Sequence, residues 1–522
     1  MWYSEDVSIK TLVIYGEMRM LSTGYVMAYI NYVYTTHHKK GVTTMDANKV
    51  IEYFKAMNQI PRGSGNEKAV SDWLVQFAKD RNLDVLQDEA NNVIIRKPAT
   101  AGYEDRPAVI LQGHMDMVCE KAADSTHDFT KDPIEHIMDG EWLHANGTTL
   151  GADNGIAVAM SLAVLDSDTI QHGPLECLFT TAEETGMDGA LAVKGEHLHG
   201  QYLLNIDTEV EGEFIVSCAG GCRVEVDVPA EREACPSAYD AALNLYMEGL
   251  LGGHSGIEIH KERANGNQVL ARLLLDLRQQ FDFQLAFFEG GTKHNAIPRN
   301  SHAQIVLKSD DVPAVTKALT EAAAQFRQEF TPQDPDISIR IEPTDVPAEV
   351  YTIETAQKLI FFLYLAPNGV FAMSHSLDNL VETSNNLAIV KDNGATLSIL
   401  ISIRSLSEHS LTYLTGKITL LAQSLGAKAT VAGGYPAWEY SRGSKLEEQA
   451  IAVYKQVTGH EPTVTAIHAG LECGLLSAAL PNTQMISFGP TITHAHTPQE
   501  RVSVPSVERM FTYLVALLKE LQ

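Results

Sequence analysis

Beyond the first 44 residues, short apolar runs alternate with stretches whose apolar positions recur every three or four residues. Short apolar runs predict strands, and the three-to-four spacing predicts amphipathic helices. In the first part of the chain the predicted strands are 92–96, 108–112, 175–180 and 202–206, one helix is predicted to begin at 45–47, and another spans 154–165. Because these strands are almost wholly apolar and alternate with helices, the pattern predicts an α/β fold with a largely buried sheet.

A glycine-rich turn at 218–222 marks a change of pattern. After it, apolar and polar residues alternate, which predicts a sheet with one face in water and a second, α+β domain. Its predicted elements are helices 268–281, 314–330 and 410–425, strand 223–228, and a strand pair, 387–391 and 396–403, that turns at Asp392-Asn393-Gly394. The α/β pattern then returns with 435–438, a helix at 445–457, a strand at 484–488 and a helix at 507–521.

Length, composition and charge narrow the class of protein. A chain of 522 residues is too long for one ordinary core, so two domains are expected. Its 45% apolar and 20% charged residues are typical of a soluble globular protein. A net charge of −27 argues against nucleic acid and anionic membrane surfaces as partners. No run of uncharged apolar residues is long enough for a transmembrane helix, and residues 1–44 do not have the pattern of a signal peptide.

The six cysteines are scattered without the dense spacing of a disulfide framework. Cys218 and Cys222 are close in sequence, but without a second pair a core or turn placement is favoured over a zinc or redox site. Reduced thiols in a cytoplasmic protein are therefore expected.

Metal-type ligands follow one another along the chain, most of them at the ends of predicted strands, where open α/β sheets place ligands. They are His114, Asp116, Asp153, Glu183, Glu184, Asp207 and His496. A hydrolytic two-metal site needs about two histidines and three carboxylates, one of them shared, and a separate carboxylate as base. The series supplies two histidines and five carboxylates. It therefore predicts a metal-dependent hydrolase.

The first ligands of the series have structural alternatives when each is taken alone. Asp116 stands two residues after His114 in an extended segment, so it would lie beside the imidazole and orient it, but a lone His-x-Asp is more often structural. Asp153 lies between glycines at the start of a predicted helix. It could bridge two metals there, or serve as the helix N-cap, which is the commoner use of such an aspartate.

The later ligands are ambiguous as well. Glu183 and Glu184 repel each other unless a cation neutralises them, so one can ligate while the other serves as base, but a solvated acidic turn has the same pattern. Either His494 or His496 could ligate, or both could lie at the surface. Agreement of all these signals in type, order and position makes coincidence improbable.

A ligand at His496, so far from the others in sequence, requires the first and last segments to fold together. The middle domain would then be an insertion that can stand over the site as a lid. The predicted organisation is an N-terminal extension at 1–44, a catalytic domain formed by 45–221 and 432–522, and a lid domain at 222–431.

Eight motifs give the sequence a family resemblance that extends from about Met45 to the C-terminus. They are 113–118, 127–133, 148–155, 183–190, 252–256, 294–299, 467–474 and 489–493. Through them the chain resembles the aminoacyl-histidine dipeptidases, in the co-catalytic zinc peptidase family that also holds aminoacylases and G-type carboxypeptidases. The fold implied is a dinuclear-metal aminopeptidase-like catalytic domain with an inserted lid.

The resemblance also implies roles for individual residues. His114 and Asp207 would hold one metal, Glu184 and His496 the other, and Asp153 would bridge them. The remaining implied roles are Glu183 as general base and acid, Asp116 as orienter of His114, His254 as the group that polarises the scissile carbonyl, and Asn295, Arg404 and the Gly470 backbone as holders of the substrate carboxylate and the reacting oxygen. Without the resemblance, Asn295 would be read as a turn residue and Arg404 as a surface charge. Relatives have Gly-Pro where this chain has His494-Ala495 before the last ligand.

The activity implied is hydrolysis of dipeptides with a free amino terminus, Xaa-His included, by a metal-bridging water that Glu183 activates. The cofactor would be two divalent metal ions, zinc first, with manganese and cobalt also suited to such ligands. A cytoplasmic homodimer without nucleic-acid or membrane partners is expected. The alternatives are an N-acyl amino-acid deacylase or carboxypeptidase of the same family, and a non-catalytic binding relative, against which the intact Glu183 argues.

Overall fold

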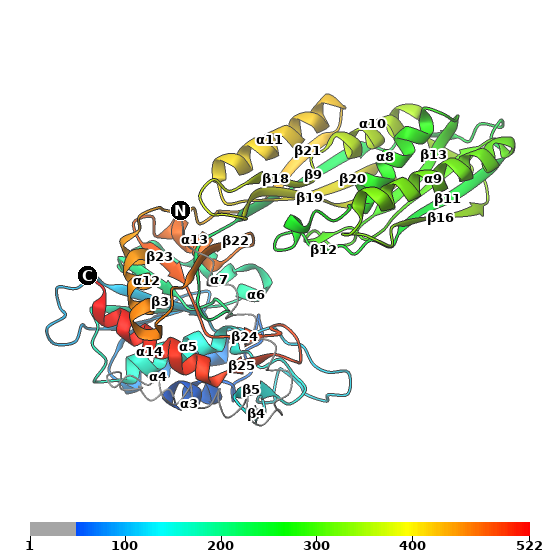
Figure 1. The fold of residues 1–522 in the computed structure, drawn as a ribbon. Coiled ribbons are helices and arrows are strands. Elements are labelled where there is room, and N and C mark those ends of the chain that lie inside the picture. The colour runs from blue at the N-terminus through cyan, green and yellow to red at the C-terminus, as the bar shows by residue number, and fades with distance from the viewer. Residues whose placement is uncertain (1–47) are drawn as a thin grey trace, which may run out of the picture. The chain divides into compact units, whose positions relative to one another are not determined.

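The computed structural model describes residues 48–522, and one of its two large sheets combines strands from both ends of that range (Figure 1). This sheet has eight strands in the order β1-β2-β6-β3-β7-β23-β8-β22. Their bounds are β1 Asp84–Gln87, β2 Val93–Lys97, β3 Val109–His114, β6 Leu175–Thr180, β7 Tyr202–Asn205, β8 Glu213–Cys218, β22 Thr463–Ile467 and β23 Gln484–Ser487. The neighbours β6, β3, β7 and β23 are parallel, so the late strand β23 completes a sheet begun by early ones.

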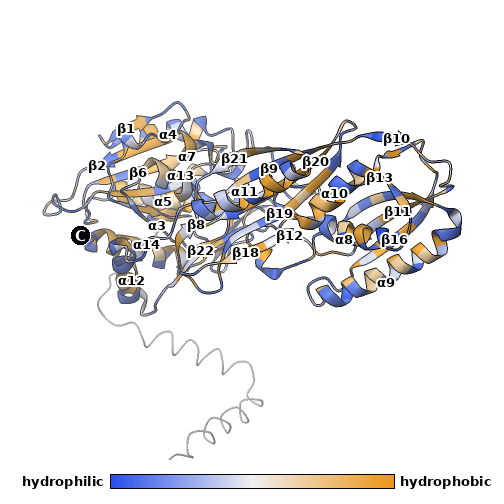
Figure 2. Cartoon of the chain, turned by 90° about the horizontal axis from the view of Figure 1, so that it is seen from above, coloured by the Kyte–Doolittle hydropathy of each residue, from blue (hydrophilic) through white to orange (hydrophobic). Residues whose placement is uncertain are grey.

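Helices enclose this sheet because its central strands are mostly apolar and completely buried. Every residue of β3, β6 and β7 is buried, and β6 and α5 are coloured mainly as hydrophobic in Figure 2. The helices are α3 Asn48–Met57, α4 Lys68–Asp80, α5 Ala152–Asp166, α6 Glu183–Gly186, α7 Asp188–Ala192, α12 Lys445–Thr458, α13 Glu472–Ala479 and α14 Val504–Glu520. Helix α5 is buried over almost its whole length and packs against β3 and α3.

The second large sheet is antiparallel and has nine strands, in the order β16-β11-β15-β13-β19-β20-β9-β21, with β18 beside β19. Its strands are β9 Gly220–Pro229, β11 Ala241–Glu248, β13 Phe283–Gly290, β15 Ser301–Leu307, β16 Ser338–Thr344, β18 Gly369–Met373, β19 Val381–Asp392, β20 Thr396–Ser405 and β21 Lys428–Tyr435. Helices α8 Gly266–Arg278, α9 Val312–Phe330, α10 Ile353–Leu365 and α11 Glu408–Ser424 contribute to its core. In β9, Val224, Val226 and Val228 enter that core while the residues between them face outward, so this sheet has one apolar face.

Smaller sheets complete the described chain. One has the order β24-β25-β5-β4, and the pairs β12-β14 and β10-β17 form two others. Their bounds are β4 His136–Asp139, β5 Trp142–Ala145, β24 Ile492–Thr493, β25 Arg501–Ser503, β12 Gly253–His254, β14 Ala296–Ile297, β10 Arg232–Ala234 and β17 Glu349–Tyr351.

The chain passes between the two large sheets at two adjacent points. On the outward passage β8 ends at Cys218 and β9 begins at Gly220, and on the return β21 ends at Tyr435 shortly before Trp438. Cys218 and Trp438 exchange two backbone hydrogen bonds, each 3.1 Å long. A Cβ at Gly220 would meet the backbone nitrogen of Ala437 at 2.5 Å, so the close approach of the two passages requires glycine there.

The predicted elements agree with the structure where the pattern is strong. The strand predicted at 175–180 is β6, and the predicted turn at Asp392-Asn393-Gly394 joins β19 to β20, with Gly394 at a φ of +83°. The first predicted helix is α3 from Asn48, and its expected beginning at 45–47 lies outside the described residues, as does the extension at 1–44. All six cysteines have free thiols, as expected.

Other elements were not predicted. The segment 435–438 is not a strand of its own: β21 ends at Tyr435, and Trp438 forms an isolated bridge. Helix α10 was missed because it is apolar on nearly every side, which hides helical spacing. Strands β11, β13, β15 and β22 were also missed, because alternating or short runs of this kind occur outside sheets too.

Candidate metal centre

Three neighbouring parallel strands carry predicted ligands at or just past their carboxyl ends. His114 is the last residue of β3 and is opposite Thr180 of β6 in the sheet register. The pair Glu183-Glu184 follows β6, and Asp207 follows β7. Because β6, β3 and β7 are adjacent, their carboxyl ends meet at one edge of the sheet, and residues far apart in sequence come together there.

The carboxylate of Asp153 lies between two imidazoles. Its Oδ1 is 3.1 Å from Nε2 of His114, and its Oδ2 is 3.0 Å from Nε2 of His496. Helix α5 has Gly151 as its N-cap, and no side chain caps it. Asp153 is therefore not the helix cap that its sequence setting also allowed, and its two oxygens are placed as a bridge would place them.

Each side of this bridge has one further carboxylate. Oδ1 of Asp207 lies 3.6 Å from Nε2 of His114, and Oε2 of Glu184 lies 3.0 Å from Nε2 of His496. In the described residues, ligand atoms of His114, Asp153 and Asp207 fall within 4.8 Å of one another, as do those of Asp153, Glu184 and His496. The structure thus brings together the five residues that the resemblance implies as ligands.

This set of donors fits two divalent cations. Imidazole nitrogen and carboxylate oxygen are the ligands that zinc and its neighbours take in catalytic sites. Oε1 of Glu184 and Oδ1 of Asp207 are buried and have no hydrogen-bond partner in the protein. Such buried oxygens are costly unless something satisfies them, and a cation would do so.

Two carboxyl groups of the site, Glu183 and Asp207, and the imidazole of His496 have raised pKa values. Burial, together with the nearby Glu472, Glu184 and Asp153, raises the pKa of Glu183 to about 8. Burial raises the pKa of Asp207 well above its ordinary value. Hydrogen bonds to Asp153 and Glu184 raise the pKa of His496 to about 11. Burial is the main cause of the first two shifts and contact with carboxylates is the main cause of the third, and two divalent cations would stabilise the charged carboxylates.

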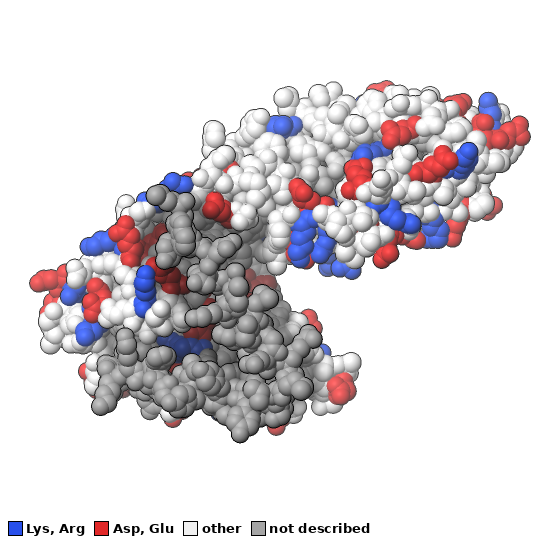
Figure 3. Space-filling model, in the orientation of Figure 1, with Lys and Arg blue, Asp and Glu red and all other residues white. Residues whose placement is uncertain are grey.

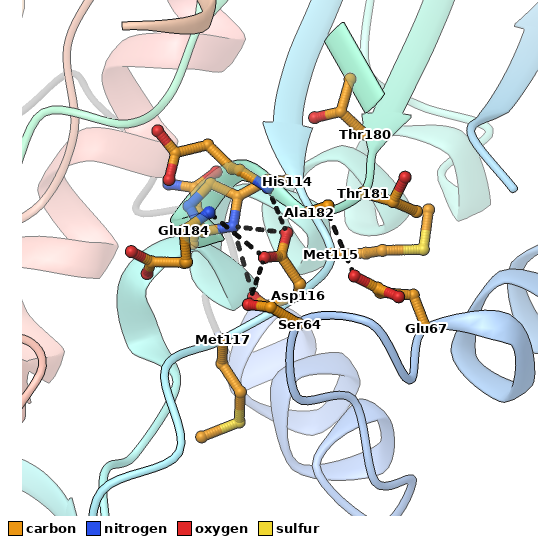
Figure 4. Close-up of polar contacts among 12 residues, drawn as sticks. Ser64, Glu67, His114, Met115, Asp116, Met117, Thr180, Thr181, Ala182 and Glu184 are labelled. Atoms are coloured by element: carbon orange, nitrogen blue, oxygen red, sulfur yellow. Dashed lines mark hydrogen bonds and ion pairs between the residues drawn. The ribbon is translucent and has the colours of Figure 1, made fainter. Parts of the chain in front are cut away.

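Asp116 joins the imidazole of His114 to the loop of the two glutamates (Figure 4). One carboxylate oxygen is 3.4 Å from Nδ1 of His114 and also accepts a hydrogen bond from the backbone N–H of Glu183. The other accepts from the Ser64 hydroxyl at 2.7 Å and from the backbone N–H of Glu184. Because Asp116 contacts Nδ1, Nε2 of His114 remains free to ligate.

Two charged residues that sequence reasoning did not single out hold the Asp153 segment. The buried carboxylate of Glu500 accepts hydrogen bonds from four consecutive backbone N–H groups, 150–153, at 2.7 to 3.3 Å. The fully buried Arg62 donates to the carbonyl oxygens of Met115, Asp116 and Gly151. Neither residue belongs to a periodic pattern of apolar positions in the sequence. The role of each is visible only in the structure, where backbone groups surround it.

Of the two histidines near the C-terminus, His496 reaches the site. Its imidazole contacts Asp153 and Glu184, whereas His494 belongs to none of the ligand groups found in the described residues. Both residues have positive φ angles, 58° and 61°, so the loop turns sharply at each of them. The local sequence could not distinguish them because this turn is not visible in it.

His254, the histidine expected to polarise the carbonyl, pairs with Ala296 in the short β12-β14 ladder. Its Nδ1 accepts hydrogen bonds from the backbone N–H groups of Gly256 and Ile257, at 3.1 and 3.2 Å. Burial and the positive Arg404 lower its pKa. An imidazole that accepts at Nδ1 carries its proton on Nε2, so His254 is a neutral donor.

The residues expected to bind the substrate carboxylate meet at Tyr435. Arg404 donates a 2.9 Å hydrogen bond from Nη1 to the hydroxyl of Tyr435, and its Nε is buried without a partner in the protein. A Cβ at Gly470 would lie 3.2 Å from the ring of Tyr435, so Gly470 is next to the same residue. Asn295 is the exception: its backbone oxygen accepts a hydrogen bond from the N–H of Ser255, next to His254.

His468 gives a pH prediction that does not involve the candidate ligands. It is buried, its Nε2 is 2.7 Å from the Ser384 hydroxyl, and burial and the nearby Arg404 lower its pKa to about 3. In the unfolded chain a histidine titrates near pH 6.5. Below that pH the unfolded state takes up a proton that the folded state does not, so this residue costs stability as the pH falls from about 6.5 towards 3.

We therefore expect His468→Asn to flatten the pH dependence of stability on the acid side. Between pH 7.5 and 5.5 the free energy of unfolding, measured in urea, should fall less for the variant than for the wild type. The difference should be up to about 1.4 kcal/mol for each pH unit below 6.5. Parallel losses in the two proteins would contradict a neutral buried His468.

The charges and the helices bear on the partners expected for this chain. In the part of the face visible in Figure 3 that is not grey, basic and acidic side chains are mostly interspersed, and several basic side chains gather near β12. No helix within residues 48–522 is long and apolar enough to cross a membrane. The expectation that nucleic acid is not a partner rests on the net charge of −27.

Comparison with known proteins decides the family. The family model described as "Peptidase family M20/M25/M40" matches residues 110–520, which is most of the chain. The chain belongs to this peptidase family. The M20 chain is 38% identical to the "Cytosol non-specific dipeptidase" of Escherichia coli (strain K12) over 470 residues, which cover 90% of this chain and 97% of the relative.

Solved structures agree with this assignment. The aminoacylhistidine dipeptidase from Vibrio alginolyticus superposes with a TM-score of 0.86 at 38% identity, covering 93% of this M20 chain and 99% of that one. The aminopeptidase PepT from Bacillus cereus superposes with a TM-score of 0.53 at 15% identity, which shows a shared fold. The predicted family, the α/β fold class and the assignment as a metallopeptidase are therefore confirmed.

Proposed function

We propose that this M20 peptidase is a metal-dependent dipeptidase that cleaves dipeptides with a free amino terminus, Xaa-His among them. The observation that carries the proposal is the 38% identity to two dipeptidases over at least nine tenths of the chain. The carboxylate and imidazole geometry supports it independently, because it supplies two adjoining cation sites and an unassigned carboxylate, Glu183, beside them.

We assign one ion to His114 and Asp207, the other to Glu184 and His496, and the bridge to Asp153. Zinc is proposed as the native metal on the mixed imidazole and carboxylate donors, which manganese and cobalt also accept. When bound, such ions acidify water and polarise the peptide carbonyl.

Glu183 is the proposed general base and acid. Desolvation raises the pKa of its half-buried carboxyl group to about 8, and Asp116 accepts a 3.2 Å hydrogen bond from its backbone N–H. Glu183 would take a proton from the attacking water and return it to the leaving amine, which needs a carboxyl close to both. Fixing the backbone at this residue limits the positions that the carboxyl can occupy.

The inserted segment, for which we propose the bounds 222–431, would complete the site as a lid. His254 presents a neutral Nε2–H, which suits donation to a developing oxyanion. Arg404 has a buried, unpaired Nε and a fork geometry that fits a carboxylate, and Asn295 and the Gly470 backbone would assist it. A substrate held at its amino group by the ions and at its carboxylate by Arg404 must be short, so dipeptides are preferred.

The test is release of free histidine from Ala-His and β-Ala-His by the purified protein, with N-acetyl-Ala-His beside them. We expect cleavage of the two free-amino dipeptides, loss of cleavage after chelation, and recovery with added zinc. Preferential cleavage of the blocked compound would indicate a deacylase instead. Two bound ions without any turnover would indicate a binding protein.

Replacement of the proposed carboxylate clamp should act mainly on substrate binding. Arg404→Lys keeps the charge but loses the fork and the Tyr435 contact, so we expect KM for Ala-His to rise about tenfold or more with a smaller change in kcat. Arg340→Lys, at an exposed arginine on β16 that pairs with Glu248 and Glu342, is the control and should leave both constants unchanged. Equal effects of the two substitutions would argue against the clamp.

We also propose a cytoplasmic location and a homodimer. The location is supported by the name of the Escherichia coli relative as a cytosol enzyme, and the dimer by the family resemblance. Light scattering after size exclusion would decide the second point, since a mass near 57.2 kDa would mean a monomer.

A further inference from the structure

One buried carboxyl group behind the candidate metal centre has no role in the proposed reaction. Glu472 is the first residue of α13 and is completely buried. A carboxyl group in such a place needs strong partners, because burial of an unpaired charge is costly. Its partners therefore indicate why it is there.

The partners of Glu472 come from the strands that carry the ligands. Its Oε2 accepts hydrogen bonds from Nε2 of Gln112, at 2.6 Å, and from the Thr180 hydroxyl, at 2.7 Å. The amide oxygen of Gln112 in turn accepts from Nδ2 of Asn205 at 2.6 Å. Gln112 and Asn205 are also opposite each other in the register of β3 and β7. One carboxylate thus connects β6, β3 and β7 through side chains alone.

The connected positions lie one step behind the ligands. Gln112 is two residues before His114 in β3, so the two side chains share a face of the sheet. Asn205 is the last residue of β7, two residues before Asp207. Thr180 is the last residue of β6, just before the loop that bears Glu183. The network therefore fixes the spacing of the strand ends from which His114 and Asp207 project.

Glu472 also connects these strands to the substrate side of the site. It follows Gly470 by two residues, and Gly470 lies against Tyr435, the partner of Arg404. Burial and the nearby Asp207 and Asp116 raise the pKa of Glu472 to about 7, which places it in the electrostatic field of the metal centre. A residue used only to dock α13 would have no need for direct partners on β3 and β6 and, through Gln112, a link to β7.

We propose that Glu472 is a positioning residue that holds His114 and Asp207 at metal-binding distance by linking the ends of β6, β3 and β7 through Thr180, Gln112 and Asn205. The proposal rests on the assignment of His114 and Asp207 as ligands of one ion under the proposed function. It makes a selective prediction, since the ion held by His114 and Asp207 should depend on Glu472 more than the ion held by Glu184 and His496.

The test measures zinc affinity, so it does not depend on turnover. The apo-protein is titrated with zinc against a chelating indicator, and native mass spectrometry counts the ions bound. For Glu472→Ala we expect one of the two ions to bind about tenfold more weakly, within the range found when an outer partner of a ligand is lost. Glu472→Gln keeps an acceptor oxygen for Gln112 and Thr180 and should restore binding to within about threefold of wild type.

The matched control is Glu176→Gln, at the opposite end of β6. Glu176 is also buried, and its Oε2 accepts backbone hydrogen bonds from His199 and Gly200 rather than contacting the strand ends. The Glu176→Gln substitution should change the stability of the protein but leave the affinity of both zinc sites unchanged.

If Glu472→Ala does not fold, Thr180→Val removes one donor to Glu472 at nearly constant shape. It should lower the affinity for the same ion by a smaller factor.

Unchanged affinity for both ions in a folded Glu472→Ala or Thr180→Val protein would overturn the proposal. Equal weakening in Glu176→Gln would also overturn it, because the effect would then be general destabilisation. A wild-type protein that binds fewer than two zinc ions would instead contradict the proposed metal assignment, and two ions with no dipeptide cleavage would contradict the proposed substrate. The two failures are thereby distinguishable.

Discussion

Glu183→Gln is expected to reduce kcat for Ala-His by about 10²–10⁴-fold while two zinc ions remain bound. The amide has nearly the shape of the carboxyl group but cannot take a proton from water and return it to an amine. The proposed ligand atoms come from five other side chains, those of His114, Asp153, Glu184, Asp207 and His496. Loss of Glu183 should therefore leave the metal sites filled, as zinc counting by native mass spectrometry would show.

The control for this substitution is Glu89→Gln, at an exposed glutamate near β2. It should leave both kcat and zinc content unchanged. If Glu183→Gln lost an ion together with its activity, Glu183 would be a ligand instead of the base. That result would favour a third group of possible ligands in the described residues, His114, Glu183 and Glu184.

Asp153→Asn should have the second large effect, and it should act on both ions at once. An amide offers one oxygen, whereas the Asp153 carboxylate presents one oxygen to the side of His114 and the other to the side of His496. We expect zinc content to fall below two and the affinity to drop by more than the ~10–100-fold typical of lost outer partners. Dipeptide cleavage should fall with it.

Asp166→Asn, at the other end of the same helix, separates this effect from damage to α5. Asp166 pairs with Arg81 and Tyr53 at the far end, so its loss should lower the unfolding temperature without changing zinc content. A variant at Asp153 that still binds two zinc ions tightly would mean that the two sites do not share this carboxylate.

The role of Asp153 shows which part of the site can be predicted from the sequence and which part cannot. Asp153 stands in a glycine-flanked turn where, taken alone, a helix cap is the favoured interpretation, and no local sequence signal favours a bridge over a cap. The decision comes from His496, more than three hundred residues away, whose imidazole meets the second oxygen of Asp153. Strand ends could be located from apolar runs, but the contact between distant segments is a property of the folded sheet.

The buried charged residues that support the site could not be predicted from the sequence for a related reason. Arg62, Glu472 and Glu500 are charged, and in a sequence such residues are expected at the surface. Each is buried because backbone or side-chain groups from other segments surround it, as the four N–H groups around Glu500 show. Polar burial depends on partners supplied by tertiary structure, so local hydrophobicity cannot predict it.

The paired passages at Cys218 and Trp438 have a consequence for how such a chain can be shortened. Since Cys218 and Trp438 exchange backbone hydrogen bonds directly, the ends left by deletion of 220–436 would already be neighbours, and a tight turn of a few residues could join them. None of the five candidate ligands lies in the deleted stretch, whereas His254 and Arg404 both do. If its remaining sheet folds alone, such a shortened protein should still bind zinc but should bind the dipeptide much more weakly.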